Sequence, residues 1–212
     1  MPGRLPTKAE MKRAKKITFA SAVLALIGFA VWQFGPFKAA FAISNLSDPA
    51  KLQTLGERGA NSRLNKIVYW LDVARHRGFS PDTTIGWAQA LNGTRDPRAS
   101  LVKTELARNM KIADELGLLT SENLDRLRRG HAAIITSGPY SGETVEIDHI
   151  VPFSLAPECG NELANLEMLP KTLNRKKSNH VGERQISHAE KLFDAGLLKK
   201  ESLEKVRHHA KP

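Results

Sequence analysis

The sequence predicts an α+β fold, in which a mostly helical soluble body contains one small strand–strand–helix unit and follows a single apolar helix near the N-terminus. Apolar residues recur every three or four positions between residues 62 and 130, and they alternate with polar residues around position 147. Residues 17–37 carry no charge. A composition of 41% apolar and 25% charged residues is typical of globular proteins and excludes a wholly disordered chain. We therefore expect four parts, residues 1–42, 43–130, 131–182 and 183–212.

The first part combines a basic head with an apolar run. Six Lys and Arg residues precede the segment from Ile17 to Phe37, which as a helix would extend about 31 Å, close to the thickness of the hydrocarbon core of a membrane. The length of the head and of the run favours an uncleaved transmembrane signal anchor, with the N-terminus in the cytoplasm and the body outside. The alternative is a signal peptide cleaved near Ala42, at Ala40-Phe41-Ala42, which would leave the body periplasmic or secreted. Both interpretations export residues 43–212.

The second part, residues 43–130, carries helix patterns separated by start and stop signals. Ile67, Val68, Leu71 and Ala74 share one helical face, and Gly78 ends that helix. Three further signals mark the limits of the next helices. They are the cap Ser80 before Pro81, the Asn92-Gly93 stop, and Gly117 at the end of a third helix that runs through Val102, Leu106, Met110 and Ala113. Thr120 can then cap a fourth helix.

The pattern changes after a cluster of turn residues at 138–142. Val145, Ile147 and His149 alternate with charged residues, which predicts a strand, and Pro152 must end its pairing. Residues 166–169 predict a second short strand, and Pro170 is well placed to begin a short helix. We therefore expect a strand, a polar loop, a second strand and a helix within residues 131–182.

The overall charge says little about function by itself. Of the formal charge of +10, residues 1–42 contribute +6, residues 43–130 contribute +4 and residues 131–212 contribute none. Only the middle portion of the body therefore supports polyanion binding. The single cysteine, Cys159, excludes an intrachain disulfide and a Cys-x-x-Cys zinc site, and we expect it to be inert in its polar loop. The chain has no glycine-rich phosphate loop, which disfavours nucleotide-driven chemistry.

Residues 143–180 contain EIDHIVPFS, ANLEMLP and LNRKKSN, and on these residues the chain resembles the HNH (His-Me finger) endonucleases. The resemblance implies a ββα-metal finger with His149 as the general base. It also implies that Asp148 and Asn174 bind one divalent metal ion, and that Asn165 supports catalysis structurally by fixing the loop between the strands. Many members have histidine where this chain has Asn174, and asparagine there weakens the case for zinc or nickel.

The residue types suit phosphodiester hydrolysis independently of the resemblance. A carboxylate and an amide oxygen suit Mg²⁺ as the cofactor, with Mn²⁺ able to substitute, and a histidine can activate water. We expect Arg175, Lys176 and Lys177 to contact nucleic-acid phosphates, and the nearby helix start to favour a bound phosphate. Asp148 and His149 can serve one phosphate only if the strand ends or twists there, because neighbouring strand residues point to opposite faces.

These features predict a membrane-anchored or exported metal-dependent endonuclease that acts on nucleic acid, with DNA favoured over RNA. A monomer with one site would nick one strand. The alternative is a membrane-tethered protein that binds nucleic acid or an envelope partner without cutting. Because the finger has few apolar residues of its own, we expect the helices of 62–130 and 183–208 to complete its core. We expect His180 and His188 to lie on the surface.

Overall fold

The computed structural model describes residues 37–178 and 180–209, together with residues 7, 8, 11, 18, 21–26 and 28 of the N-terminal segment. The chain divides into two compact units, residues 1–38 and 39–212.

The expected apolar helix of the first unit, residues 17–37, lies for the most part outside the described residues. Among the residues that the structure does describe, no helix is long and apolar enough to cross a membrane. The alternative cleavage site, Ala40-Phe41-Ala42, lies within helix α2 (Phe37–Ser47). There Ala40 is fully buried and Ala39 is 2% exposed, so the compact body already begins before residue 43.

The N-terminal half of the second unit is helical, as the sequence predicts. It comprises α2 and then α3 (Pro49–Gln53), α4 (Gly59–Arg75), α5 (Pro81–Leu91), α6 (Arg98–Glu115) and α7 (Ser121–Arg129). The predicted caps are confirmed, because Ser80 Oγ accepts from Thr83 N at 3.1 Å and Thr120 Oγ1 accepts from Asn123 N at 3.3 Å. Gly78 and Gly117 adopt positive φ angles of 84° and 65° just beyond the ends of α4 and α6, a conformation that favours glycine.

The C-terminal half contains the small sheet. Strand β1 (Val145–His149) pairs antiparallel with β2 (Leu166–Pro170), and α8 (Lys171–Lys177), α9 (Glu183–Asp194) and α10 (Lys200–His209) follow. Two short 3-10 turns, η1 (Pro157–Cys159) and η2 (Leu163–Asn165), lie between the strands. Strand β1 ends at His149, three residues before Pro152, and beyond it Ile150 N donates to the main-chain oxygen and Val151 N to the side-chain oxygen of Asn165. The fold is therefore α+β, mostly helical, with a two-stranded sheet.

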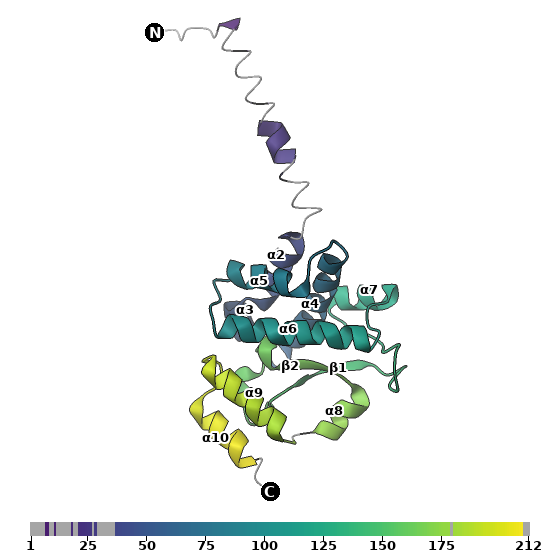
Figure 1. Cartoon of the computed structure of the whole chain (residues 1–212), viewed down its shortest axis with the longest axis vertical. Helices are drawn as coiled ribbons and strands as arrows, with labels where there is room; N and C mark the ends of the chain where they lie inside the picture. The colour runs from purple at the N-terminus through teal and green to yellow at the C-terminus, as the bar shows by residue number, and fades with distance from the viewer. Residues whose placement is uncertain are drawn as a thin grey trace. The chain divides into compact units, whose positions relative to one another are not determined.

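Helix α6 joins the two halves of the unit. It contacts α4 and α5 on one side and β2, η2 and α9 on the other, and Figure 1 shows it between the layer of α2 to α5 and the sheet. Leu106 of α6, Met168 of β2 and Leu192 of α9 belong to one hydrophobic core. The flanking helices thus complete the core around the strands, as expected for a sheet too small to bury a core alone.

Candidate functional site

The register of the two strands gives the sheet an apolar face and a charged face. Asp148 lies opposite Glu167, and His149 lies opposite Leu166. Because side chains alternate along a strand, His149 shares a face with Leu166, which is fully buried in the core. Asp148 and Glu167 share the other face with Glu146, two residues earlier on β1. We call Glu146, Asp148 and Glu167 the acidic face.

Helix α8 covers the acidic face. It follows β2 directly and contacts both strands. Asn174 Nδ2 donates to Glu146 Oε2 at 2.8 Å, and Lys177 Nζ donates to Asp148 Oδ2 at 2.7 Å. The two predicted metal ligands, Asp148 and Asn174, therefore lie on elements that contact each other, and each is hydrogen-bonded to a different residue.

The ammonium group of Lys177 lies among three oxygen atoms. Besides Asp148, its Nζ contacts Glu167 Oε1 at 3.2 Å and the main-chain oxygen of His149. The Lys177 side chain is 13% exposed, against 23% for that of Asp148 and 1% for that of Glu167. The sequence predicts that Lys177 contacts a phosphate, whereas here α8 turns its charge inward onto the sheet.

The other two basic residues of α8 are placed differently. Arg175 and Lys176 are exposed and are accessible to an anionic partner. Of the three consecutive basic residues, Lys177 therefore faces the sheet, whereas Arg175 and Lys176 face solvent. A short helix packed on a sheet can present only one side to it.

The Glu167 carboxylate is almost fully buried and accepts from several cations. Lys177 contacts its Oε1, Arg184 donates to its Oε2, and Arg108 NH2 lies 3.5 Å from the same Oε2. Burial opposes ionisation, but the hydrogen bond from Arg184 and the charges of Lys177 and Arg184 outweigh it, so the pKa of Glu167 lies below its ordinary value. Glu167 is therefore a fixed negative charge beneath α8.

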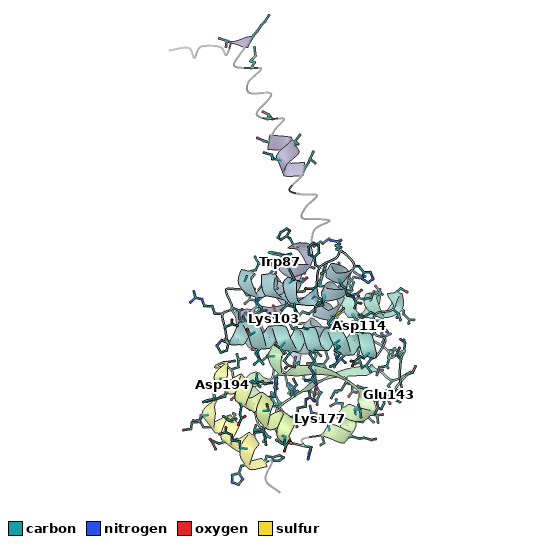
Figure 2. The ribbon with its side chains drawn as sticks, viewed as in Figure 1. Trp87, Lys103, Asp114, Glu143, Lys177 and Asp194 are labelled. Carbon is teal, nitrogen blue, oxygen red and sulfur yellow. The ribbon has the colours of Figure 1, made fainter. Side chains whose placement is uncertain are left out.

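The beginning of α8 is bound by a carboxylate of the chain itself. Thr172 donates from its main-chain N to Glu143 Oε2 at 2.9 Å and from Oγ1 to Glu143 Oε1 at 2.8 Å. These hydrogen bonds, the main-chain one first, lower the pKa of Glu143. Figure 2 shows Glu143 and Lys177 near opposite ends of α8. A phosphate at this helix start would therefore share the donors of Thr172 with Glu143.

His149 lies at the end of β1 and is 8% exposed. Its Nε2 is 2.9 Å from the main-chain oxygen of Gly160. Because a carbonyl oxygen only accepts, Nε2 carries the hydrogen and Nδ1 of the neutral ring carries the lone pair. The ring of Phe153 lies nearby, with its centroid 5.7 Å from that of His149. His149 is the last residue of β1 and still pairs with Leu166, so its side chain and that of Asp148 lie on opposite faces of the sheet within the strand.

Asn165 fixes the loop between the strands. Its Oδ1 accepts from Val151 N at 2.9 Å, and its Nδ2 donates to Val151 O at 3.1 Å. Its main-chain oxygen also accepts from Ile150 N at 2.8 Å. Asn165 is fully buried, so its contribution is structural and it does not meet a substrate directly.

Two residues expected in polar or surface positions are buried. Cys159 is fully buried, and burial first, then the charges of Glu158 and Glu162, raises the pKa of its thiol to about 12. His188 is 5% exposed, and its Nε2 lies 2.8 Å from Ala164 O. The expectation that His188 lies on the surface is therefore wrong, because α9 turns it toward η2. His180 is exposed, as expected.

Sequence reasoning missed Glu146 and Glu167. Glu146 alternates with apolar residues in β1, and Glu167 is the one charged residue of β2. Both lie on the same face of the sheet as Asp148 once the register is known. The signal was the glutamate at the second position of LEMLP, since a charge within a buried strand needs a partner. That partner could not be named from sequence, because Lys177 and Arg184 reach Glu167 from two different helices.

The donor chemistry of the acidic face suits a divalent cation. Carboxylate oxygens and an amide oxygen are ligands that Mg²⁺ prefers, and Asp148, Glu146 and Asn174 supply them. Within the described ranges, however, no three His, Cys, Asp or Glu side chains form a group that could hold a metal ion.

Comparison with known proteins assigns no relative. No family model matches the chain, and neither the curated proteins nor the solved structures give a match.

Proposed function

We propose that this chain is a metal-dependent endonuclease of the HNH type, which hydrolyses phosphodiester bonds in nucleic acid, DNA rather than RNA. The observation that most supports it is the hydrogen bond between His149 Nε2 and Gly160 O. This bond fixes the tautomer of a histidine at a strand end, directly after the candidate metal ligand Asp148. Asn165 supports the same loop from within.

His149 would act as the general base. Its Nδ1 lone pair takes a proton from a water molecule while the water oxygen bonds to phosphorus. The bond from phosphorus to the leaving sugar oxygen breaks and that oxygen takes a proton from solvent water, which yields a phosphomonoester and an alcohol. The hydrogen bond from Nε2 to the Gly160 oxygen strengthens as the ring becomes positively charged, so the carbonyl stabilises the protonated histidine.

Asp148 and Asn174 would hold the divalent cation, Mg²⁺ or Mn²⁺. When bound, the cation stabilises the negative charge on the phosphoryl group and the leaving oxygen. Arg175 and Lys176, both exposed on α8, would bind the flanking phosphates. Such contacts are independent of base sequence and weaken with salt. We also propose that residues 17–37 anchor the body at a membrane, outside the cytoplasm.

The test is nicking of supercoiled plasmid by the full chain in detergent, with Mg²⁺ or Mn²⁺ and with EDTA. We expect metal-dependent conversion to open circles, and a loss of about a hundredfold or more in rate for His149→Ala, because general bases contribute on that order. His131→Ala is the matched control, since His131 is an exposed histidine outside the sheet and α8. Equal rates for wild type and His149→Ala would refute the assignment of the base.

A second candidate function is nucleic-acid binding without cleavage. The ion pair between Lys177 Nζ and Asp148 Oδ2 at 2.7 Å favours it, because a carboxylate neutralised by the chain itself needs no metal. This candidate predicts that DNA binding survives EDTA and that no metal supports nicking of the plasmid by the folded wild type.

A further inference from the structure

We propose that Lys177 is a built-in cation of the acidic face, and that it competes with a divalent metal ion for Asp148. Metal binding then requires the Lys177 ammonium group to leave. The inference rests on the proposed function in one respect, namely that the metal binds at Asp148.

The contacts of Lys177 resemble those of a bound cation. Asp148 Oδ2 at 2.7 Å, Glu167 Oε1 at 3.2 Å and the main-chain oxygen of His149 surround its Nζ. Two carboxylates and a carbonyl are also the oxygen donors that hard divalent ions bind. An ammonium nitrogen at hydrogen-bond distance from Asp148 Oδ2 takes the space that a metal ion on that oxygen would need. The two cations therefore exclude each other on that oxygen.

The charges around the site lead to the same conclusion. The acidic face is contacted by three cations, Lys177, Arg184 and Arg108, of which Arg108 also pairs with Glu105. A divalent ion would add two positive charges to this set, and the withdrawal of Lys177 removes one positive charge from it. Because like charges a few ångströms apart repel strongly where water is scarce, the metal-bound state favours an outward Lys177.

The position of Lys177 allows this exchange. It is the last residue of α8, and its long stem can rotate toward solvent without unwinding the helix. Arg184 and Arg108 contact the other oxygen of Glu167, so that carboxylate stays paired when Lys177 leaves. Asp148 then becomes available to the metal ion, while the charge released from the acidic face lies beside the exposed Arg175 and Lys176.

The test measures Mn²⁺ binding to the full chain in detergent by the electron paramagnetic resonance signal of free Mn²⁺, without nucleic acid. We expect Lys177→Met to bind Mn²⁺ about tenfold or more tightly than wild type, because a neighbouring, largely shielded positive charge is removed. Lys176→Met is the matched control. It removes the same charge from the exposed side of the same helix, so we expect an affinity within about twofold of wild type, since exposed charges are screened.

Two further variants make the result decisive. Lys177→Gln replaces Lys177→Met if the latter fails to fold, as judged by circular dichroism. Asp148→Asn combined with Lys177→Met should remove the gain, which places the Mn²⁺ at Asp148. Unchanged or weaker binding in the folded Lys177 variants overturns the competition. A gain shared equally by Lys176→Met, or one that survives Asp148→Asn, overturns it as well.

The same measurements separate this inference from the proposed function. A chain that binds Mn²⁺ more tightly after Lys177→Met but never nicks plasmid refutes the nuclease and leaves the competition standing. A chain that nicks plasmid while Lys177→Met leaves its Mn²⁺ affinity unchanged refutes only the competition.

Discussion

His149 and Gly160 are joined by a hydrogen bond of 2.9 Å from the imidazole Nε2 to the main-chain oxygen. The position of that oxygen depends on Gly160 having no side chain. A β-carbon on Gly160 would lie 2.6 Å from Cε2 of Phe153 and 3.2 Å from Pro157 O. The Phe153 ring therefore packs directly against the backbone that orients the candidate base.

We expect Gly160→Ala to displace either the Phe153 ring or the Gly160 carbonyl. Overpacking of this kind costs about 1–3 kcal/mol in the free energy of unfolding. A shift of the carbonyl would misplace His149 and lower the rate of plasmid nicking about tenfold to a hundredfold. Urea unfolding and nicking rates measured on the same preparation check both effects.

The control for Gly160→Ala is a double-mutant cycle with Phe153→Ala. Phe153 is 40% exposed, so the single Phe153→Ala change should cost little stability. The double variant should recover most of the activity that Gly160→Ala loses, because the clashing ring is gone. Additive losses would show that Gly160 acts through some contact other than Phe153.

The helices were predictable because their limits are set by neighbouring residues. Ser80 with Pro81 and Thr120 each supply a cap within the segment that they begin, and Gly78 and Gly117 supply the stops. These signals act over a few positions, so the sequence alone contains them. The alternation from Val145 to His149 likewise predicted β1, whereas the contact of the following Val151 with Asn165 of η2 is not visible in it.

The electrostatics of the candidate site were not predictable in the same way. Lys177 meets Asp148 across 29 positions of sequence, and it meets Glu167 across 10. Those contacts depend on the strand register and on the side of α8 that packs against it, and no local pattern specifies either. The burial of His188 has the same origin, since polar neighbours in sequence do not reveal that η2 covers it.

Replacing Asn165 should be strongly destabilising. Asn165→Leu would leave the N–H and C=O of Val151 without their present partners in a buried position. Each such group costs about 1–3 kcal/mol, so we expect the free energy of unfolding to fall by about 2–6 kcal/mol in urea unfolding. Asn45→Leu, whose hydrogen bonds are exposed, is the control. Similar losses in the two variants would contradict the assigned role of Asn165.

Cys159 should be unreactive in the native protein. The thiol is fully buried and its pKa is raised to about 12, so almost no thiolate is present at mildly alkaline pH. We expect a disulfide reagent such as Ellman's to react readily with Cys159 only after unfolding in guanidinium chloride. Its reaction with the native protein should be at least about a hundredfold slower than with the unfolded protein. Rapid reaction of the native chain would show that the loop from η1 to η2 opens readily.

His188 should make the fold sensitive to acid. Burial above all, and then the charges of Lys191, Arg184 and Arg108, lowers its pKa from 6.5 to about 4, although the hydrogen bond to Ala164 O opposes the shift. Between these two pH values the unfolded chain binds a proton at His188 that the folded chain does not bind. The free energy of unfolding therefore falls as pH decreases through this window, by about 3 kcal/mol in total from this residue.

The contribution of His188 can be isolated with His188→Gln, because a glutamine amide can still donate to Ala164 O and does not titrate. Urea unfolding should show that the free energy of unfolding of wild type falls, relative to that of the variant, by about 3 kcal/mol as pH decreases from 6.5 to about 4. His180→Gln, at an exposed position, should leave the wild-type acid dependence unchanged. If His188→Gln and wild type lose stability in parallel over this window, His188 is protonated within the fold and its burial does not control the acid response.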